Sequence, residues 1–104
     1  MLHKIKQLFG IEPPTDYKAI VANGGLIIDV RTREEYQQGH IKGSINVPLN
    51  VLMANLSKLK TNKPIITCCA SGMRSASAKS MLVSKGYKEV YNGGGWHSLQ
   101  YKLK

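Results

Sequence analysis

The chain has 104 residues, of which 42% are hydrophobic, and a formal net charge of +9. This length predicts one domain with a single core, and no apolar run approaches the roughly 20 residues of a transmembrane helix. Residues 1–9 mix charged with apolar side chains, which is not the pattern of a secretory signal. Two adjacent cysteines give no spaced disulfide framework, so we expect a cytoplasmic protein.

The positive charge is concentrated in the C-terminal two thirds of the chain. Residues 1–35 hold five basic and five acidic side chains, whereas residues 36–104 hold ten basic side chains and one acid, Glu89. Such a field raises the local concentration of anionic substrates or partners, although a basic surface also serves solubility alone. No recognition motif or interleaved aromatic run accompanies the charge, which argues against nucleic-acid binding.

Helical and strand patterns alternate along the chain. Residues 1–14 are expected to be an N-terminal extension with a short amphipathic helix, and residues 15–104 the domain. Apolar, β-branched runs predict strands at 26–30, 45–47, 65–68 and 89–91. Helices are expected after the N-cap Thr15 and at 31–38, 51–59, 75–85 and 96–103, with a turn at 92–95. The alternation predicts an α/β fold, a parallel four- to five-stranded sheet flanked by helices on both faces.

The stretch that carries chemistry is residues 64–78. A short apolar strand ends on a cysteine, and a tight loop of small residues, a cation and a helical pattern follow. Ligands of α/β sheets bind at the carboxyl ends of strands, and backbone N–H groups at a helix N-terminus favour anions. A thiol placed there should react as the thiolate, and Arg74 adds a permanent charge that can hold an oxyanion. We therefore interpret the stretch as a cysteine nucleophile in an anion cradle.

Four segments of the chain, taken in order, form a recognisable set. They are Asp29-Val30-Arg31 with Glu35-Tyr36, residues 39–48, residues 69–75, and Gly86-Tyr87, Val90-Tyr91 and Gly94-Gly95. In these segments the chain resembles a single-domain rhodanese. The resemblance covers about residues 15–99 and implies the rhodanese-like fold. It identifies Cys69 as the active-site cysteine, because the glycine and arginine of the family's loop then fall at Gly72 and Arg74.

The resemblance implies a sulfurtransferase that acts through a persulfide on Cys69. Sulfane sulfur would pass from a small anionic donor such as thiosulfate to a thiophilic acceptor, cyanide or a thiol, and an acceptor protein is a further candidate partner. The site residues implied beside Cys69 are Ala70, Ser71, Gly72, Met73, Arg74 and Ser75. No metal or organic cofactor is needed, and we expect neither nucleic acid nor membrane as a partner.

Three residues depart from the family pattern. Ser44 stands where alanine is usual, Cys68 where an aromatic residue is frequent, and Leu99 where many members have tryptophan. Consecutive strand side chains face opposite ways, so Cys68 should point away from the pocket. We interpret Cys68 as a buried, inert thiol, with a resolving thiol as the alternative. The family's first edge strand is not evident in the sequence.

Several polar residues near the motifs have structural interpretations. Asp29, inside an apolar strand, is expected to accept backbone N–H bonds from a neighbouring loop. Arg31 and Glu35 are four residues apart, which favours an ion pair. His40 is expected to brace its loop. For Ser75, donation of a hydrogen bond to a bound anion and capping of the following helix both remain open.

Two other functions remain open alternatives. A cysteine phosphatase or arsenate reductase also sets a thiolate and an arginine around an oxyanion. To bind tetrahedral phosphate, those enzymes need a wider loop, with five residues between the cysteine and the arginine. In this chain only four residues separate Cys69 from Arg74. A non-enzymatic sulfur-relay or protein-binding module would instead use the basic surface to contact an acidic partner in a salt-dependent way.

Overall fold

The computed structural model describes residues 14–59 and 62–104, so the helix expected in the N-terminal extension lies outside the described residues. Within these residues the sheet has four parallel strands, which are β1 (Leu26–Asp29), β2 (Ile45–Asn46), β3 (Ile65–Cys69) and β4 (Val90–Gly95). Their order in space is β2-β1-β3-β4, so β3 is a central strand with partners on both sides. All five residues of β3 are buried, which explains its continuous apolar sequence.

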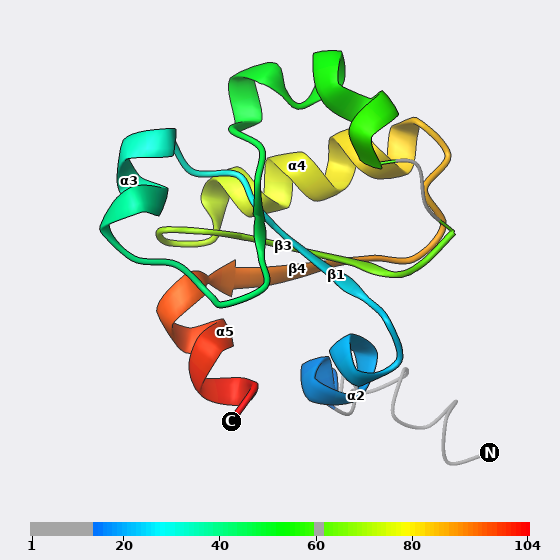
Figure 1. The fold of residues 1–104 in the computed structure, drawn as a ribbon. Helices are drawn as coiled ribbons and strands as arrows, with labels where there is room; N and C mark the ends of the chain where they lie inside the picture. The colour runs from blue at the N-terminus through cyan, green and yellow to red at the C-terminus, as the bar shows by residue number, and fades with distance from the viewer. Residues whose placement is uncertain (1–13, 60–61) are drawn as a thin grey trace, which may run out of the picture.

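Helices cover both faces of this sheet, as the alternation of patterns predicts. Figure 1 shows α4 (Met73–Ser84) and the green 3₁₀ segments η1 (Leu49–Val51) and η2 (Met53–Leu59) on one face, with α2 (Tyr17–Ala22) and α5 (Trp96–Lys102) on the other. The short helix α3 (Arg33–Gln38) lies near the start of α4, at the edge toward which the β4 arrow points. The predicted α/β fold is confirmed.

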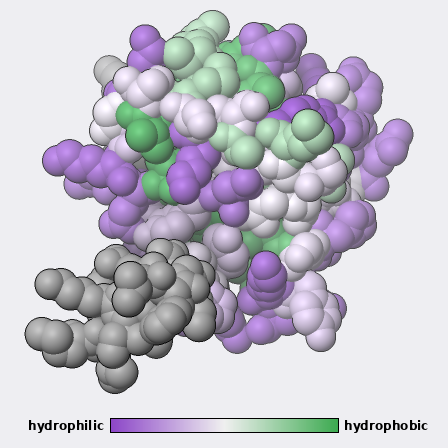
Figure 2. Space-filling model, turned by 180° about the vertical axis from the view of Figure 1, so that it is seen from behind, coloured by the Kyte–Doolittle hydropathy of each residue, from purple (hydrophilic) through white to green (hydrophobic). Residues whose placement is uncertain are grey.

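In the described part of the chain the core consists of two apolar clusters, one on each face of the sheet. One cluster joins Ile28 and Cys69 to Leu52 and Leu82, and the other joins Ile66 and Cys68 to Leu99, among further residues. Seen from behind, the surface is hydrophilic over much of its area and apolar only in scattered patches (Figure 2). Among residues 14–59 and 62–104, no helix is both long enough and apolar enough to cross a bilayer.

Several expected elements differ from the structure in type or in boundary; the helix expected at 31–38, for example, begins only at Arg33. Asp16 rather than Thr15 caps α2, because its carboxylate accepts the N–H of Ala19 at 3.0 Å. The helix expected at 51–59 consists of 3₁₀ turns instead. The side-chain amide of Asn55 donates to the carbonyl of Val51 at 2.8 Å, and the Asn55 backbone is non-helical. Helix α4 begins two residues earlier than expected, at Met73.

The glycine run at residues 93–95 also differs from expectation, because it continues β4 instead of forming a turn. Asn92 pairs with Thr67 and Gly95 with Cys69, so β4 carries one residue more than β3 between these two pairs. Gly94 has φ +78°, which accommodates this bulge. A Cβ on Gly93 would lie 2.8 Å from Ile66 Cγ2, so a residue without a side chain is required for close packing.

Candidate active site

Cys69 is the last residue of β3 and lies at the carboxyl edge of the sheet. Cys68 precedes it, and the two side chains belong to opposite apolar clusters, as strand alternation predicts. Both cysteines are free thiols and fully buried, so burial does not distinguish them. Their environments do. Burial, reinforced by the nearby Asp29 carboxylate, raises the pKa of Cys68 to about 12.

The sulfur of Cys69 lies against backbone N–H groups of the loop that follows it. The N–H of Gly72 donates to Sγ at 2.9 Å and that of Ser75 at 3.3 Å. Burial acts to raise the pKa of Cys69, but hydrogen bonds from Ser75, Gly72 and Ser71 together outweigh it, so the pKa is lowered from its ordinary value. Cys69 is therefore the cysteine whose surroundings favour the thiolate.

The loop at residues 70–72 depends on glycine. Gly72 has φ +105° and is the N-cap of α4, a left-handed conformation that disfavours side chains. A Cβ on Gly72 would lie 3.5 Å from the Cα of Gly94, so the loop also lies close to β4. In this conformation the first turn of α4 directs N–H groups toward the sulfur. Met73, one of the expected site residues, follows the cap, and its side chain is 79% exposed.

Arg74 forms an ion pair with Glu35, from α3. Its Nη1 lies 2.7 Å from Oε1 and its Nη2 3.0 Å from Oε2, and both side chains are 36% exposed. Chiefly this guanidinium, with help from Thr32, lowers the pKa of Glu35 to about 2. Glu35 also completes a capping box with Thr32 at the start of α3. One carboxylate thus joins the cap of α3 to the loop around Cys69.

The expected pair between Arg31 and Glu35 is therefore wrong. Arg31 instead pairs with Asp29, with 2.7 Å between Nη2 and Oδ2, and both side chains are buried. Asp29 also accepts the backbone N–H of Arg31 at 3.0 Å, in line with its expected structural role. Arg31 donates to the carbonyl of Gly39 at 2.7 Å and lies over the ring of Trp96, 4.6 Å from its centroid. The pair therefore ties β1 to α5 and to the loop after α3.

Ser75 does not cap α4, because it lies in the first turn of the helix, after the cap residue Gly72. Its expected hydrogen bond to a bound anion stays a prediction. Its Oγ is 3.0 Å from the carbonyl oxygen of Gly72, 2.6 Å from Oδ1 of Asn92 and 3.5 Å from Sγ of Cys69. Asn92 was expected only as a turn residue, and no signal in the sequence distinguishes it from a surface asparagine.

His40 is placed as expected, as a brace of its loop. Its Nδ1 lies 2.7 Å from the carbonyl oxygen of Tyr36, and the two rings stack with centroids 3.8 Å apart. The Tyr36 hydroxyl in turn donates to the carbonyl of Ser44 at 2.7 Å. In the described parts of the chain, no group of three or more His, Cys, Asp or Glu side chains could hold a metal ion.

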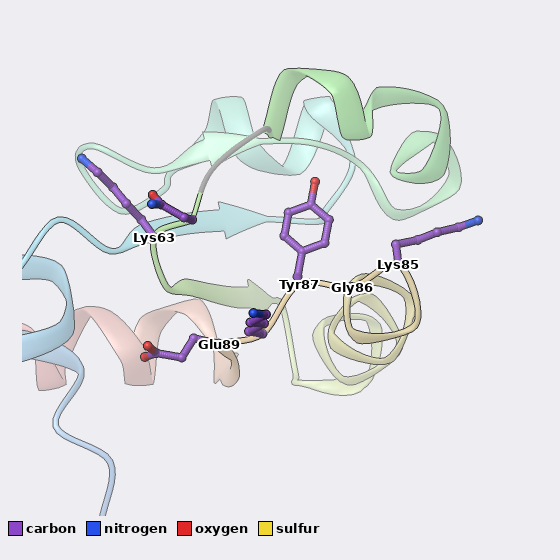
Figure 3. Close-up of a pocket in the computed structure, with 7 residues that line it drawn as sticks. Lys63, Lys85, Gly86, Tyr87 and Glu89 are labelled. Atoms are coloured by element: carbon purple, nitrogen blue, oxygen red, sulfur yellow. The ribbon is translucent and has the colours of Figure 1, made fainter.

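A cavity of about 570 Å³ lies elsewhere, beside the segments that lead into β3 and β4 (Figure 3). Figure 3 shows the ring of Tyr87 between Lys63 and Lys85, with Glu89 below. None of the residues that line this cavity belongs to the loop around Cys69. The cavity is thus separate from the cysteine site.

Known proteins are similar to this chain in both sequence and fold. The family model of the rhodanese-like domain matches residues 13–101. The thiosulfate sulfurtransferase GlpE of Pseudomonas savastanoi pv. phaseolicola is 30% identical over 87 residues, which are 84% of this chain and 82% of that protein. The uncharacterized protein YqhL of Bacillus subtilis is 37% identical over 79 residues, or 75% of this chain and 63% of that protein. The solved structure of a rhodanese with anions from E. coli is 34% identical, with a TM-score of 0.68 over 72% of this chain and 91% of that one.

Proposed function

The chain belongs to the family of rhodanese-like domains, and we propose that it is a sulfurtransferase that carries sulfane sulfur as a persulfide on Cys69. One observation supports this proposal most directly. The N–H groups of Gly72 and Ser75 lie 2.9 and 3.3 Å from the Cys69 sulfur, at the carboxyl end of a central strand. Such donors stabilise a thiolate, and they would equally stabilise a negatively charged persulfide.

The proposed reaction has two displacement steps. The Cys69 thiolate attacks the outer sulfur of thiosulfate, a new S–S bond forms, and sulfite leaves with the electron pair of the old S–S bond. A thiolate or cyanide then attacks the outer sulfur of the persulfide and takes it, and Cys69 leaves as the thiolate. No base is needed in either step once the thiol is ionised.

Arg74 is the proposed contact for the anionic end of the donor. Its guanidinium is partly exposed at the start of α4 and carries a permanent charge that suits sulfonate-type oxygens. Because Glu35 already binds this guanidinium, a donor must share or replace that carboxylate. Cys69 is fully buried, so the surrounding loop must also shift for a donor to reach the sulfur.

For the physiological donor and acceptor, the proposal names only a chemical class. We propose a small anionic donor and a thiol acceptor, free or on a protein, in a reducing cytoplasm where the free thiols of Cys68 and Cys69 persist. The excess of basic side chains in residues 36–104 favours both an anionic donor and an acidic acceptor protein.

The test is the intact mass of the protein after incubation with thiosulfate and then with cyanide. We expect a gain of one sulfur atom, its loss with cyanide, and no gain in Cys69→Ser. Cys68→Ser is the matched control and should still gain the sulfur. No gain with either thiosulfate or polysulfide would contradict the proposal. Turnover of a phosphate ester that depends on Cys69 would favour the phosphatase alternative instead.

A further inference from the structure

Asn92 lies on β4 beside the cysteine site, and the direction of its side-chain amide is determined. The backbone N–H of Gly94 donates to Asn92 Oδ1 at 2.9 Å. An N–H group is only a donor, so the oxygen of the amide, and not its nitrogen, must occupy this position. The same oxygen lies 2.6 Å from the hydroxyl of Ser75.

This geometry determines where the single hydroxyl proton of Ser75 goes. The Asn92 oxygen and the carbonyl oxygen of Gly72, at 2.6 and 3.0 Å, can only accept, so one of them takes the proton. Asn92 offers the shorter contact. The lone pairs of the hydroxyl then face Cys69, whose S–H donates to Oγ at 3.5 Å. With its proton on Asn92, the hydroxyl donates no bond of its own to the sulfur, and stabilisation of the thiolate falls to the backbone N–H groups of Gly72 and Ser75.

We propose that Asn92 is a positioning residue for the sulfur-transfer reaction, which takes the proton of Ser75 and so prevents this hydroxyl from donating to the Cys69 sulfur. The inference rests on the proposed function. In the proposed reaction, Asn92 keeps the Cys69 thiolate nucleophilic, since a thiolate with fewer hydrogen-bond donors is more basic and attacks sulfur more rapidly. The backbone cradle ionises Cys69, and Asn92 limits how far the sulfur is stabilised.

Other charged and titratable groups also act on Cys69. Arg74 on α4 interacts with it electrostatically, and Glu35 on α3 neutralises part of that charge. Cys68, the preceding residue of β3, also interacts electrostatically with Cys69. All of these groups are unchanged in the variants proposed below. Differences in the pKa of Cys69 between the variants therefore show which acceptor the hydroxyl proton of Ser75 binds.

The test is the pH dependence of alkylation of Cys69 by iodoacetamide in the full chain. In Asn92→Ala the hydroxyl of Ser75 loses its shortest acceptor, and the Cys69 thiolate, as the charged and stronger acceptor, then competes with the carbonyl of Gly72 for its proton. We expect the pKa of Cys69 to fall by about one unit, the size of one hydrogen bond to a charged group. The limiting rate at high pH should fall about threefold, because the nucleophilicity of a thiolate decreases with its pKa.

Two further variants distinguish this role from a merely structural one. In Ser75→Ala we expect no rise in the pKa of Cys69, because the wild-type hydroxyl does not donate to the sulfur. In the double variant Ser75→Ala with Asn92→Ala, the shift caused by Asn92→Ala should disappear. Tyr91→Phe is the matched control on the same strand. Its hydroxyl donates to Glu89, away from Cys69, so the alkylation profile should not change.

Two outcomes would overturn the proposal. A rise of about one pKa unit in Ser75→Ala would show that the hydroxyl already donates to the thiolate, and this result needs no Asn92 variant to fold. If Asn92→Ala shifted the pKa of Cys69 equally in the wild-type chain and in the Ser75→Ala variant, Asn92 would act by another route than the hydroxyl of Ser75. Alkylation requires no sulfur donor. Failure of this inference is therefore distinguishable from failure of the persulfide assay.

Discussion

The carboxylate of Glu35 holds the guanidinium of Arg74 through two hydrogen bonds of 2.7 and 3.0 Å, although the two residues lie on different helices. Arg74 is the proposed contact for the anionic donor. The structure therefore shows the proposed donor-binding cation already paired with a carboxylate of the same chain. Glu35 would compete with the donor for the same N–H groups.

Substitution Glu35→Gln is expected to strengthen binding of an anionic donor. The amide still fits the capping box with Thr32, since glutamine serves at this position as glutamate does. It removes a negative charge beside Arg74, which is worth about 1 kcal/mol at the surface, so the KM for thiosulfate should fall about fivefold. Steady-state sulfur transfer to cyanide measures this effect. An unchanged or higher KM would show that the pair positions Arg74 instead of competing with the donor.

The same ion pair should be visible in an acid titration. Glu35 has its pKa lowered to about 2 from an ordinary value of 4.5, chiefly by Arg74. A carboxylate with a depressed pKa stabilises the fold above its ordinary pKa, and that contribution is lost as the pH falls from about 4.5 through about 2. Solvent screens this half-exposed pair, so the stability change should be small.

NMR of the side-chain carboxyl carbon of Glu35 measures its pKa directly. In Arg74→Gln we expect the pKa to move back toward 4.5, though not completely, because Thr32 also lowers it. A wild-type Glu35 that titrates near 4.5 would show that the pair does not form in solution.

The buried pair of Asp29 and Arg31 predicts a large effect on stability. In Asp29→Asn the guanidinium keeps its burial but loses its counter-charge, which typically costs about 3–5 kcal/mol. Urea unfolding followed by circular dichroism measures the loss. Asp16→Asn is a suitable control, because this exposed residue caps α2 and asparagine caps as well as aspartate. Equal stability of the two variants would contradict a structural role for the pair.

The pairing of Arg31 illustrates where sequence reasoning fails. A spacing of four residues favours an ion pair only when both residues lie on one helix, and α3 begins at Arg33, after Arg31. Arg31 therefore extends from the end of β1 back toward Asp29, two residues earlier. By contrast, the fold was predictable, because apolar runs, helical patterns and glycine ends alternate in the order that a parallel sheet requires.

The candidate site was predictable in part for a related reason. The loop after β3 is local in sequence, so its small residues and its cation already indicate a cradle around Cys69. Asn92 and Glu35 reach the site from β4 and α3, at separations of 17 residues from Ser75 and 39 from Arg74. No local pattern records such contacts. The glycine run at 93–95 indicated a turn for the same reason, since the close packing that requires Gly93 comes from β3 and α5.

The last prediction concerns the two adjacent thiols. At pH 8 in the folded protein, iodoacetamide should modify Cys69 and leave Cys68 intact. Loop hydrogen bonds outweigh burial and lower the pKa of Cys69, whereas burial raises that of Cys68 to about 12, which leaves almost no thiolate there at that pH. Peptide mass mapping identifies the alkylated residue, and unfolding in urea should make the two cysteines react alike. Modification of Cys68 in the folded chain at a rate near that of Cys69 would instead indicate an accessible second thiol, and the resolving role for Cys68 would then be the better interpretation.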